Sequence, residues 1–561
     1  MLDRIFALAV AFVLAASLAP PPAQALDLAA ARSGGAVLAE ALKLGQARDW
    51  AAAERVAARS GDPLIPDLVL WQKLRAGAGS MAELQVFAGR RAGWPGLEAL
   101  ARAMSGTTIG RGSGGLTGAA AANWQQFGQL WSAKRYDEAA QLLGQITGDR
   151  HKLGVPEIWA SRREALARRM ARLGRGALGY ELARQHHLSP ADASDYAELE
   201  WLAGWIALRK LGEPRQAVTH FERFNQVVET PISLGRGGYW LGRAHEALGE
   251  AARAAEWYRA GARHQTAFYG QLAAAKHGVA GDADIAAAAL PDWSKSPALR
   301  SDDVRAGVLL LYAGEEALAF WMFSELGKQM DGGAALGALA GLGLELGRPH
   351  FAVRIAKHAA RKGLILYPAY YPVTELAGYA SKVEPALAMA IARQETELNP
   401  RAISPAGARG LMQLMPGTAK KVAGQIGEAY SDDRLIEDWQ YNARLGQSYL
   451  AEQIGRFGGS YMLAAAAYNA GPHRVDQWIG EFGDPRLPGV DLIDWMESIP
   501  FSETRNYVQR VMEGLYVYRT RLAGHAGPMS IAEDLMRGVR GGCPAGGTQV
   551  LAALAGASGT C

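Results

Sequence analysis

The chain has 561 residues, of which 49% are apolar and 20% are charged, a globular composition that excludes a largely disordered protein. Its length exceeds the roughly 250–300 residues at which a single hydrophobic core stops growing, so two to four domains are expected. The net charge of +4 is spread over the chain and gives little support to nucleic-acid binding, and two cysteines exclude a disulfide framework or a four-thiolate zinc site.

Residues 1–25 have the pattern of a secretory signal peptide. Arg4 precedes an almost continuous apolar run over residues 5–18, and Ala23-Gln24-Ala25 has the small-x-small form that signal peptidase cleaves. The run is shorter than the roughly 20 residues that span a bilayer, and prolines at 20–22 break it, which disfavours the alternative of an uncleaved anchor helix. We therefore expect an exported, periplasmic protein without a transmembrane segment in its mature chain.

Residues 26–290 predict a succession of helices that stack into a superhelix. Leu211-Gly212-Glu213 and Leu248-Gly249-Glu250 are self-similar at an offset of 37 (211 to 248), close to the period of TPR-like helix–turn–helix repeats. Units of this kind bury their apolar faces only by stacking on their neighbours. Two interpretations stay open: a scaffold that binds or encircles a polymer, and a plain helical spacer. Residues 291–366 are expected to form a helical linker domain.

Motifs for cofactors are absent from this part of the sequence. The glycine-rich stretch at 105–118 lacks the Gly-Lys-Ser/Thr end of a phosphate loop and is interpreted as a linker. His186 and His187 are adjacent, which places them on different parts of a helix surface and argues against shared metal ligation. We expect neither a cofactor nor a metal site.

The composition changes at Tyr367, where residues 367–372 interrupt the helical pattern and predict a domain boundary. A helix is expected from Pro385, which suits a first helical position, until Asn399-Pro400 ends it. Glu395 falls on the same face as the apolar Ile391, four residues earlier. A carboxyl group that faces a core has a raised pKa, as a general acid near neutral pH requires. For an isolated glutamate, however, a solvated side chain or an ion pair with a nearby arginine is the more ordinary interpretation.

Four sequence blocks, which follow one another along the chain, favour the functional interpretation of Glu395. They are residues 393–400 (RQETELNP), 404–419 (SPAGARGLMQLMPGTA), 467–472 (AYNAGP) and 497–508 (ESIPFSETRNYV). In this order and spacing they resemble the soluble lytic murein transglycosylases. The resemblance covers about residues 367–521, and the preceding helical array is similar to the ring-forming superhelix of that family.

The resemblance implies a mainly all-α protein: an N-terminal α-helical superhelix of TPR-like repeats, followed by a goose-lysozyme-like catalytic domain at 367–525. It implies a lyase that cleaves the β-1,4 bond between N-acetylmuramic acid and N-acetylglucosamine in peptidoglycan and forms 1,6-anhydromuramoyl ends. The single catalytic residue of the family falls on Glu395, which acts first as an acid and then as a base. An internal hydroxyl held near C1 has a high effective concentration, so one carboxyl group suffices.

The same resemblance assigns a set of substrate-binding residues. Thr396 stands where the family usually has serine, and its alternative role is to cap backbone at the helix end. Leu411 and Leu414 are expected in the core, and core packing is the alternative for Tyr468 and Tyr507. Asn469 is as readily structural as functional, and Glu503 has the alternative of an ion pair with Arg505 or another arginine. The expected substrate-binding residues are Thr396, Gln413, Met415, Tyr468, Asn469, Glu503 and Tyr507.

Two other functions stay open beside the transglycosylase. One is a hydrolytic muramidase with Glu503 as its second carboxylate, and the other is a non-catalytic scaffold that recruits cell-wall proteins through its superhelix. The Gly/Ala-rich tail at 526–561 holds both cysteines, Cys543 and Cys561, which either pair in an oxidising compartment or remain thiols.

Overall fold

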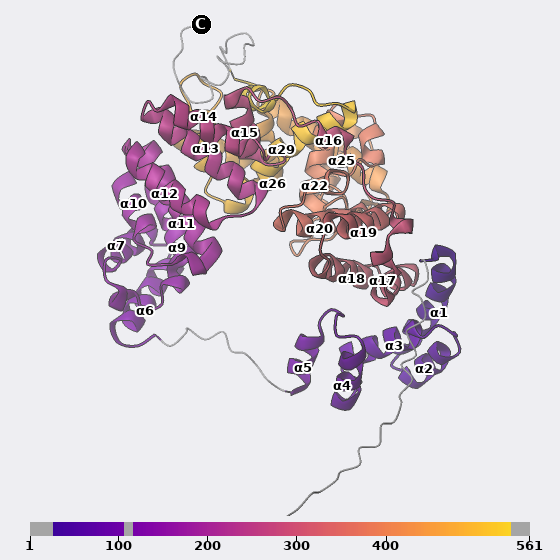
Figure 1. Ribbon diagram of the computed structural model, residues 1–561. Helices are drawn as coiled ribbons and strands as arrows, with labels where there is room; N and C mark the ends of the chain where they lie inside the picture. The colour runs from indigo at the N-terminus through magenta and orange to yellow at the C-terminus, as the bar shows by residue number, and fades with distance from the viewer. Residues whose placement is uncertain (1–25, 106–115, 540–561) are drawn as a thin grey trace, which may run out of the picture. The chain divides into compact units, whose positions relative to one another are not determined.

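The computed structural model describes residues 26–105 and 116–539 (Figure 1). The expected signal peptide, most of the glycine-rich linker and both cysteines lie outside the described residues. The regular elements of the described residues are all helices. Pairing of the β type is limited there to the isolated bridges Ile403–Arg409 and Arg409–Leu414. The predicted mainly all-α class is therefore confirmed. None of the described helices is both long enough and apolar enough to cross a bilayer.

The chain divides into two compact units. Unit 1 contains the described residues up to Met104 together with Asp292–Leu326, and unit 2 contains the rest. The domain boundaries expected from the sequence remain a prediction. The helices of unit 1 are α1 (Leu28–Gln46), α2 (Trp50–Ala58), α3 (Leu64–Arg75), α4 (Met81–Arg90), α5 (Leu97–Ser105), the short η4 (Trp293–Lys295) and η5 (Pro297–Arg300), α17 (Asp302–Tyr312) and most of α18 (Glu316–Gln329).

The first part of unit 2 is an array of paired helices. Tandem helices pack on their neighbours along the array, as the repeat pattern predicts. The helices are α6 (Gly118–Ser132), α7 (Tyr136–Ile146), α8 (Arg150–Leu153), η1 (Pro156–Trp159), α9 (Ala160–Arg172), α10 (Gly176–Arg184), η2 (Pro190–Asp192), α11 (Ala193–Ile206), η3 (Ala207–Leu211), α12 (Pro214–Val227), α13 (Pro231–Ala247), α14 (Ala251–Gly261), α15 (Phe268–His277) and α16 (Asp284–Ala287).

The predicted repeat corresponds to the pairs α11–α12 and α13–α14. Gly212 and Gly249 end the first helix of each pair with left-handed backbone, as expected. Within those first helices, however, the equivalent positions are Gly204 and Gly242, each of which lies against an aromatic ring of the second helix. Their offset is 38 rather than 37, because η3 is a π-helical turn that inserts one residue before the glycine.

The second part of unit 2 contains a helical bundle built around α22 (Pro385–Thr396), which packs against α29 (Ser502–Ala523). Residues 367–370 of the predicted interruption form the short helix α21, and the domain boundary expected there stays a prediction. The remaining helices are α19 (Gly333–Glu345), α20 (Pro349–Arg361), α21 (Tyr367–Tyr370), η6 (Glu375–Gly378), α23 (Pro416–Ile426), α24 (Arg434–Glu437), α25 (Trp439–Arg456), α26 (Tyr461–Ala470), α27 (Pro472–Phe482), α28 (Leu492–Glu497) and α30 (Ile531–Met536).

Helix α22 differs from the sequence expectation in two ways. Its residues 386–393 are all buried, so it is a central helix rather than one with a single apolar face. It also ends at Thr396, before Asn399-Pro400, because Glu397 and Leu398 adopt left-handed backbone with φ of 56° and 72°. Leu398 is buried, and Glu397 pairs with Lys357 and Arg354 of α20, and these contacts offset the conformational cost.

A buried polar network joins the helical array to α28 and α29. Glu497 is almost fully buried and accepts hydrogen bonds from Tyr269 (2.5 Å) and Gln509 (2.9 Å), while Arg168 lies 3.3 Å from its carboxylate and Arg505 3.7 Å. A buried carboxylate is tolerated only when partners of this kind satisfy it. The array is therefore attached to the bundle by specific charge pairs as well as by packing.

Acidic residues at the start of α28 make a second connection with the repeats. Asp491 accepts from Arg209 and Arg243, both at 2.9 Å, and Asp494 accepts from Arg209 (2.7 Å) and from the Trp205 indole (3.2 Å). Arg209 and Arg243 come from the two members of the predicted repeat. One contact that the repeats make is thus with another part of the same chain.

Candidate active site

Glu395 lies in the last turn of α22, and its side chain is partly buried where α22 meets α29. The pKa of the Glu395 carboxyl is raised to about 7, mainly by burial and also by the negative charge of Glu503, while the hydrogen bond from Tyr507 opposes the shift. A carboxyl group with a pKa near 7 holds a proton and releases it at neutral pH. The geometry agrees with the sequence expectation that Glu395 faces the core.

Tyr507 of α29 donates its hydroxyl hydrogen to Oε1 of Glu395 at 2.7 Å. The ring is buried, and this burial, together with the neighbouring carboxyl, holds the pKa of the Tyr507 hydroxyl well above its ordinary value. Tyr507 therefore stays protonated and fixes one carboxyl oxygen of Glu395. The resemblance predicted Tyr507 as a groove residue, and the structure brings it into direct contact with Glu395.

Glu503 lies one helical turn before Tyr507 on α29 and is exposed. The alternative of an ion pair with Arg505 is wrong, because the Arg505 guanidinium is buried and faces Glu497, Glu164 and the Ile499 carbonyl. Within the described residues Glu503 has no ion-pair partner. The Glu503 side chain is therefore a second carboxylate, on the same side of α29 as Tyr507.

Side chains of α22 and α26 hold the loop between α22 and α23. The Thr396 hydroxyl lies 2.9 Å from the Leu411 carbonyl and 3.1 Å from that of Ala392, and Tyr468 donates to the Met412 carbonyl at 2.8 Å. Thr396 thus satisfies backbone, as its alternative interpretation holds. Tyr468 also lies close enough for the Glu395 charge to contribute to its raised pKa, although burial is the larger cause.

Gln413 and Met415 lie on the open side of this loop. Gln413 has left-handed backbone (φ 48°), and its amide nitrogen donates to the carbonyls of Gly410 (2.9 Å) and Ala402 (3.1 Å). This arrangement directs the amide nitrogen into the loop, so the amide oxygen is the group that remains to accept a hydrogen bond. Met415 is 45% exposed, whereas Leu411 and Leu414 are buried, as the sequence analysis expects.

Asn469 lies in the last turn of α26 and accepts a hydrogen bond from the Thr504 hydroxyl at 2.6 Å. The bond ties α26 to the first turn of α29, which carries Glu503. Asn469 therefore contributes to the position of α29, in line with its structural interpretation.

Asn442 of α25 is a site residue that the sequence analysis missed. It is fully buried, accepts from the Met412 amide at 2.8 Å, and donates to the carbonyls of Arg409 (2.9 Å) and Leu435 (3.0 Å). These bonds hold the loop from within. A single asparagine in an otherwise ordinary helix gave no signal for this role.

Arg393, two residues before Glu395, belongs to the first sequence block, which by itself predicts no role for it. Its buried guanidinium donates to the Tyr370 carbonyl at 2.6 Å and lies 3.9 Å from the centroid of the Tyr371 ring. Arg393 therefore fixes α22 against the segment that precedes it. Across the described ranges, 26–105 and 116–539, no cluster of three or more His, Cys, Asp or Glu side chains can hold a metal ion.

Comparisons with known proteins agree with this geometry. The family model described as "Transglycosylase SLT domain" matches residues 373–486, and the model "Soluble lytic transglycosylase helical domain" matches residues 498–526. Residues 373–486 belong to the transglycosylase SLT domain family. The resemblance found in the sequence is thereby confirmed for the SLT domain, which contains Glu395 and the loop described above.

Relatives and solved structures extend the comparison. The soluble lytic murein transglycosylase of Escherichia coli K12 is 42% identical over 147 residues, which are 26% of this chain and 22% of the relative. That of Salmonella typhimurium is 43% identical over 148 residues, again 26% and 22%. The matched segment thus spans about a fifth of the length of these relatives.

The fold beyond the SLT domain is similar to two solved structures. An inactive variant of the lytic transglycosylase Slt from Pseudomonas aeruginosa matches with a TM-score of 0.54 and 22% identity, over 87% of this chain and 81% of that one. The 70-kDa soluble lytic transglycosylase in complex with bulgecin A matches with a TM-score of 0.51 and 19% identity, over 90% and 99%. The superhelix followed by a lysozyme-like domain is therefore confirmed as the fold.

Proposed function

We propose that this chain is a lytic transglycosylase that cleaves peptidoglycan glycan strands, with Glu395 as its acid and base. The observation that carries the proposal is the Glu395 carboxyl, whose pKa is raised to about 7 by burial and whose Oε1 is fixed by Tyr507 at 2.7 Å. A catalytic acid works best when its pKa lies near the operating pH. The membership of residues 373–486 in the SLT family supports the substrate class.

The proposed reaction needs no water and no cofactor. Glu395 gives its proton to the oxygen between N-acetylmuramic acid and N-acetylglucosamine as the bond from that oxygen to C1 breaks. The C6 hydroxyl of the same muramic residue then attacks C1, and the Glu395 carboxylate takes the proton from this hydroxyl. The products are an N-acetylglucosamine end with a free hydroxyl group and a 1,6-anhydromuramoyl end, and Glu395 is again protonated.

The neighbouring residues divide the remaining tasks. Tyr507 orients the carboxyl of Glu395, and the exposed Glu503 stabilises the positive charge that develops at C1. The Gln413 amide oxygen accepts from sugar hydroxyl or amide groups, and Met415 provides an apolar wall. Thr396, Tyr468 and Asn469 hold the loop and α29 in place.

A hydrolytic muramidase is the second candidate, and the environment of Glu503 favours it. Glu503 is exposed, free of an ion pair within the described residues, and close enough to Glu395 to raise its pKa. Hydrolases of this type use two carboxyl groups, roughly 5–9 Å apart. The two reactions differ in their products, because hydrolysis adds one water molecule and leaves an ordinary reducing end.

The proposal also places the protein in the cell envelope. The substrate and the pattern of residues 1–25 support export to the periplasm, with residues 1–25 as a cleaved signal. The same proposal includes cell-wall proteins as partners that bind to the superhelix.

Mass spectrometry of digested peptidoglycan tests the function. We expect anhydromuramoyl ends from the wild type, one water lighter than hydrolytic ends, and none from Glu395→Gln. The Gln side chain has nearly the same shape but cannot give up a proton, so folding and glycan binding should persist. Glu437→Gln, at an exposed glutamate of α24, is the matched control and should cleave normally. Reducing ends as the main product would establish the hydrolase, and undiminished turnover by Glu395→Gln would remove the catalytic assignment.

A further inference from the structure

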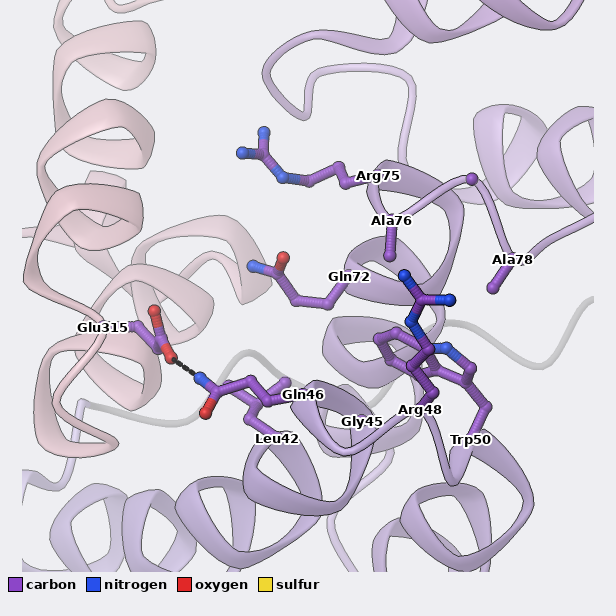
Figure 2. A pocket seen from close by; sticks show the side chains of 11 residues that line it. Leu42, Gly45, Gln46, Arg48, Trp50, Gln72, Arg75, Ala76, Ala78 and Glu315 are labelled. Atoms are coloured by element: carbon purple, nitrogen blue, oxygen red, sulfur yellow. Dashed lines mark hydrogen bonds between the residues drawn. The ribbon is translucent and has the colours of Figure 1, made fainter.

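Unit 1 contains a pocket of about 670 Å³ that lies outside the SLT domain (Figure 2). This volume falls in the range of small-molecule binding sites. The pocket is formed where the end of α1, the start of α2 and the end of α3 meet the turn before α18. Its lining residues include Leu42, Gln46, Arg48, Trp50, Gln72, Arg75 and Glu315.

Two arginines line the pocket without an acidic partner. Other cations of unit 1 are paired with acids: Lys73 with Glu54 and Glu83, and Arg91 with Asp67 and Asp302. Arg48 and Arg75, by contrast, have no carboxylate partner in the part of the chain that the structure describes.

The Arg75 guanidinium lies over the rings of Trp71 and Trp321, at 5.1 and 4.8 Å from their centroids. Partial burial lowers the pKa of Arg75, since no acid offsets the loss of water. Its positive charge is thus oriented by the two rings and left to interact with a ligand.

Gln72 adds a hydrogen-bond donor that has no acceptor. Its amide nitrogen is buried and has no partner in the described structure. Figure 2 shows that the Gln72 and Arg75 side chains leave the same end of α3 and extend to the same side of the pocket. A buried donor without an acceptor is costly, so a ligand oxygen at this point would give the Gln72 amide a hydrogen bond that no described protein group provides.

The opposite wall of the pocket offers a hydrogen-bond acceptor and apolar surface in place of donors. Glu315 accepts a weak hydrogen bond from Gln46 at 3.4 Å and leaves acceptor capacity toward the pocket, while Leu42 and Trp50 contribute apolar surface. A phosphate or sulfate ion would satisfy the donors but face the Glu315 carboxylate. A peptide end, with a carboxylate and nearby N–H groups, satisfies both walls.

We propose that this pocket binds the carboxylate end of a short peptide, through Arg48, Arg75 and the Gln72 amide, with Glu315 accepting from the peptide N–H groups. The peptides carried by peptidoglycan strands are such ligands, and this identification of the source rests on the proposed function. The pocket would then hold the peptide part of the substrate, apart from the glycan site at Glu395.

Calorimetric titration of the full chain tests the proposal without any need for cleavage. The probes are the tripeptide Ala-Glu-Lys with free carboxylates and its fully amidated form, Ala-Gln-Lys amide. We expect saturable binding of the free acid, and a loss of about tenfold or more in affinity for the amide and for Arg75→Gln or Gln72→Leu, because each change removes a charge-assisted or buried hydrogen bond. Arg59→Gln, at the exposed arginine that follows the last residue of α2 and does not line the pocket, is the matched control and should bind like the wild type.

Three results would overturn the proposal: equal affinity for the acid and the amide, unchanged binding by Arg75→Gln and Gln72→Leu, or inorganic phosphate binding as tightly as the peptide. Because binding is measured directly, its failure is distinct from a failure of the proposed cleavage, which the Glu395→Gln products report. A protein that binds the peptide but does not cleave glycan would keep the pocket and lose only the peptidoglycan source.

Discussion

The Glu395 carboxyl is subject to two opposing influences from the same helix. Tyr507 donates a hydrogen bond that favours the charged form, and Glu503 contributes a negative charge that disfavours it. Both lie on α29, one turn apart. The pKa of Glu395 is therefore set by burial and then adjusted in both directions by α29.

Substitution of these two residues should move the pH profile of cleavage in opposite directions. Glu395 must be protonated to act as an acid, so kcat/KM should fall as the pH rises through about 7. Tyr507→Phe removes the donor that stabilises the carboxylate, and the falling limb should shift to higher pH. Glu503→Gln removes the negative charge, and the limb should shift to lower pH.

Steady-state cleavage measured between pH 4 and 9 checks both shifts. The Glu437→Gln variant should keep the wild-type limb, since Glu437 is exposed on α24. Two shifts in the same direction, or none, would show that a group other than Glu395 sets the limb.

At the scale of elements, the loop between α22 and α23 depends on one backbone conformation. Gly410 has φ of 75°, and a Cβ there would lie 1.9 Å from the Leu435 carbonyl oxygen and 2.3 Å from the Asn442 amide nitrogen. The glycine is what allows Asn442 to reach the Arg409 and Leu435 carbonyls. The loop between α22 and α23 therefore packs directly against α24 and α25, next to the candidate site.

Gly410→Ala should lower the free energy of unfolding by about 2–4 kcal/mol and reduce cleavage, because backbone must move to accept the methyl group. Denaturant unfolding and turnover measure the two effects. Gly417→Ala is the control: Gly417 is the second residue of α23, has nothing within 4 Å of a built Cβ, and should be neutral. A Gly410→Ala protein as stable and active as Gly417→Ala would refute the role of this turn.

At the scale of unit 2, the helical array and the bundle share buried charges. Glu497 lies among Arg168 of α9, Tyr269 of α15 and Arg505 of α29. Arg505 precedes Tyr507 by two residues, so this network also fixes the helix that contacts Glu395. The array is thus part of the support of the candidate site.

Glu497→Gln should cost about 1–3 kcal/mol in the free energy of unfolding, because Arg168 and Arg505 lose a shared buried counter-charge, although Glu164 remains 2.9 and 3.6 Å from them. Glu452→Gln breaks the solvent-exposed pair with Lys421, and should change stability by less than about 1 kcal/mol. Chemical denaturation of both variants gives the comparison. Equal small losses would mean that packing alone joins the array to the bundle.

The sequence by itself determined the helical class, the repeat and the first residue of α22, and it selected Glu395 as the candidate acid, because helix period, glycine turns and the four sequence blocks are local features. Only the tertiary structure decided how α22 ends and what surrounds Glu395. Lys357 and Arg354 of α20 hold Glu397 in left-handed backbone, and Asn442 of α25 holds the loop. These partners lie tens of residues away in the chain, and their proximity arises from packing that no local pattern records.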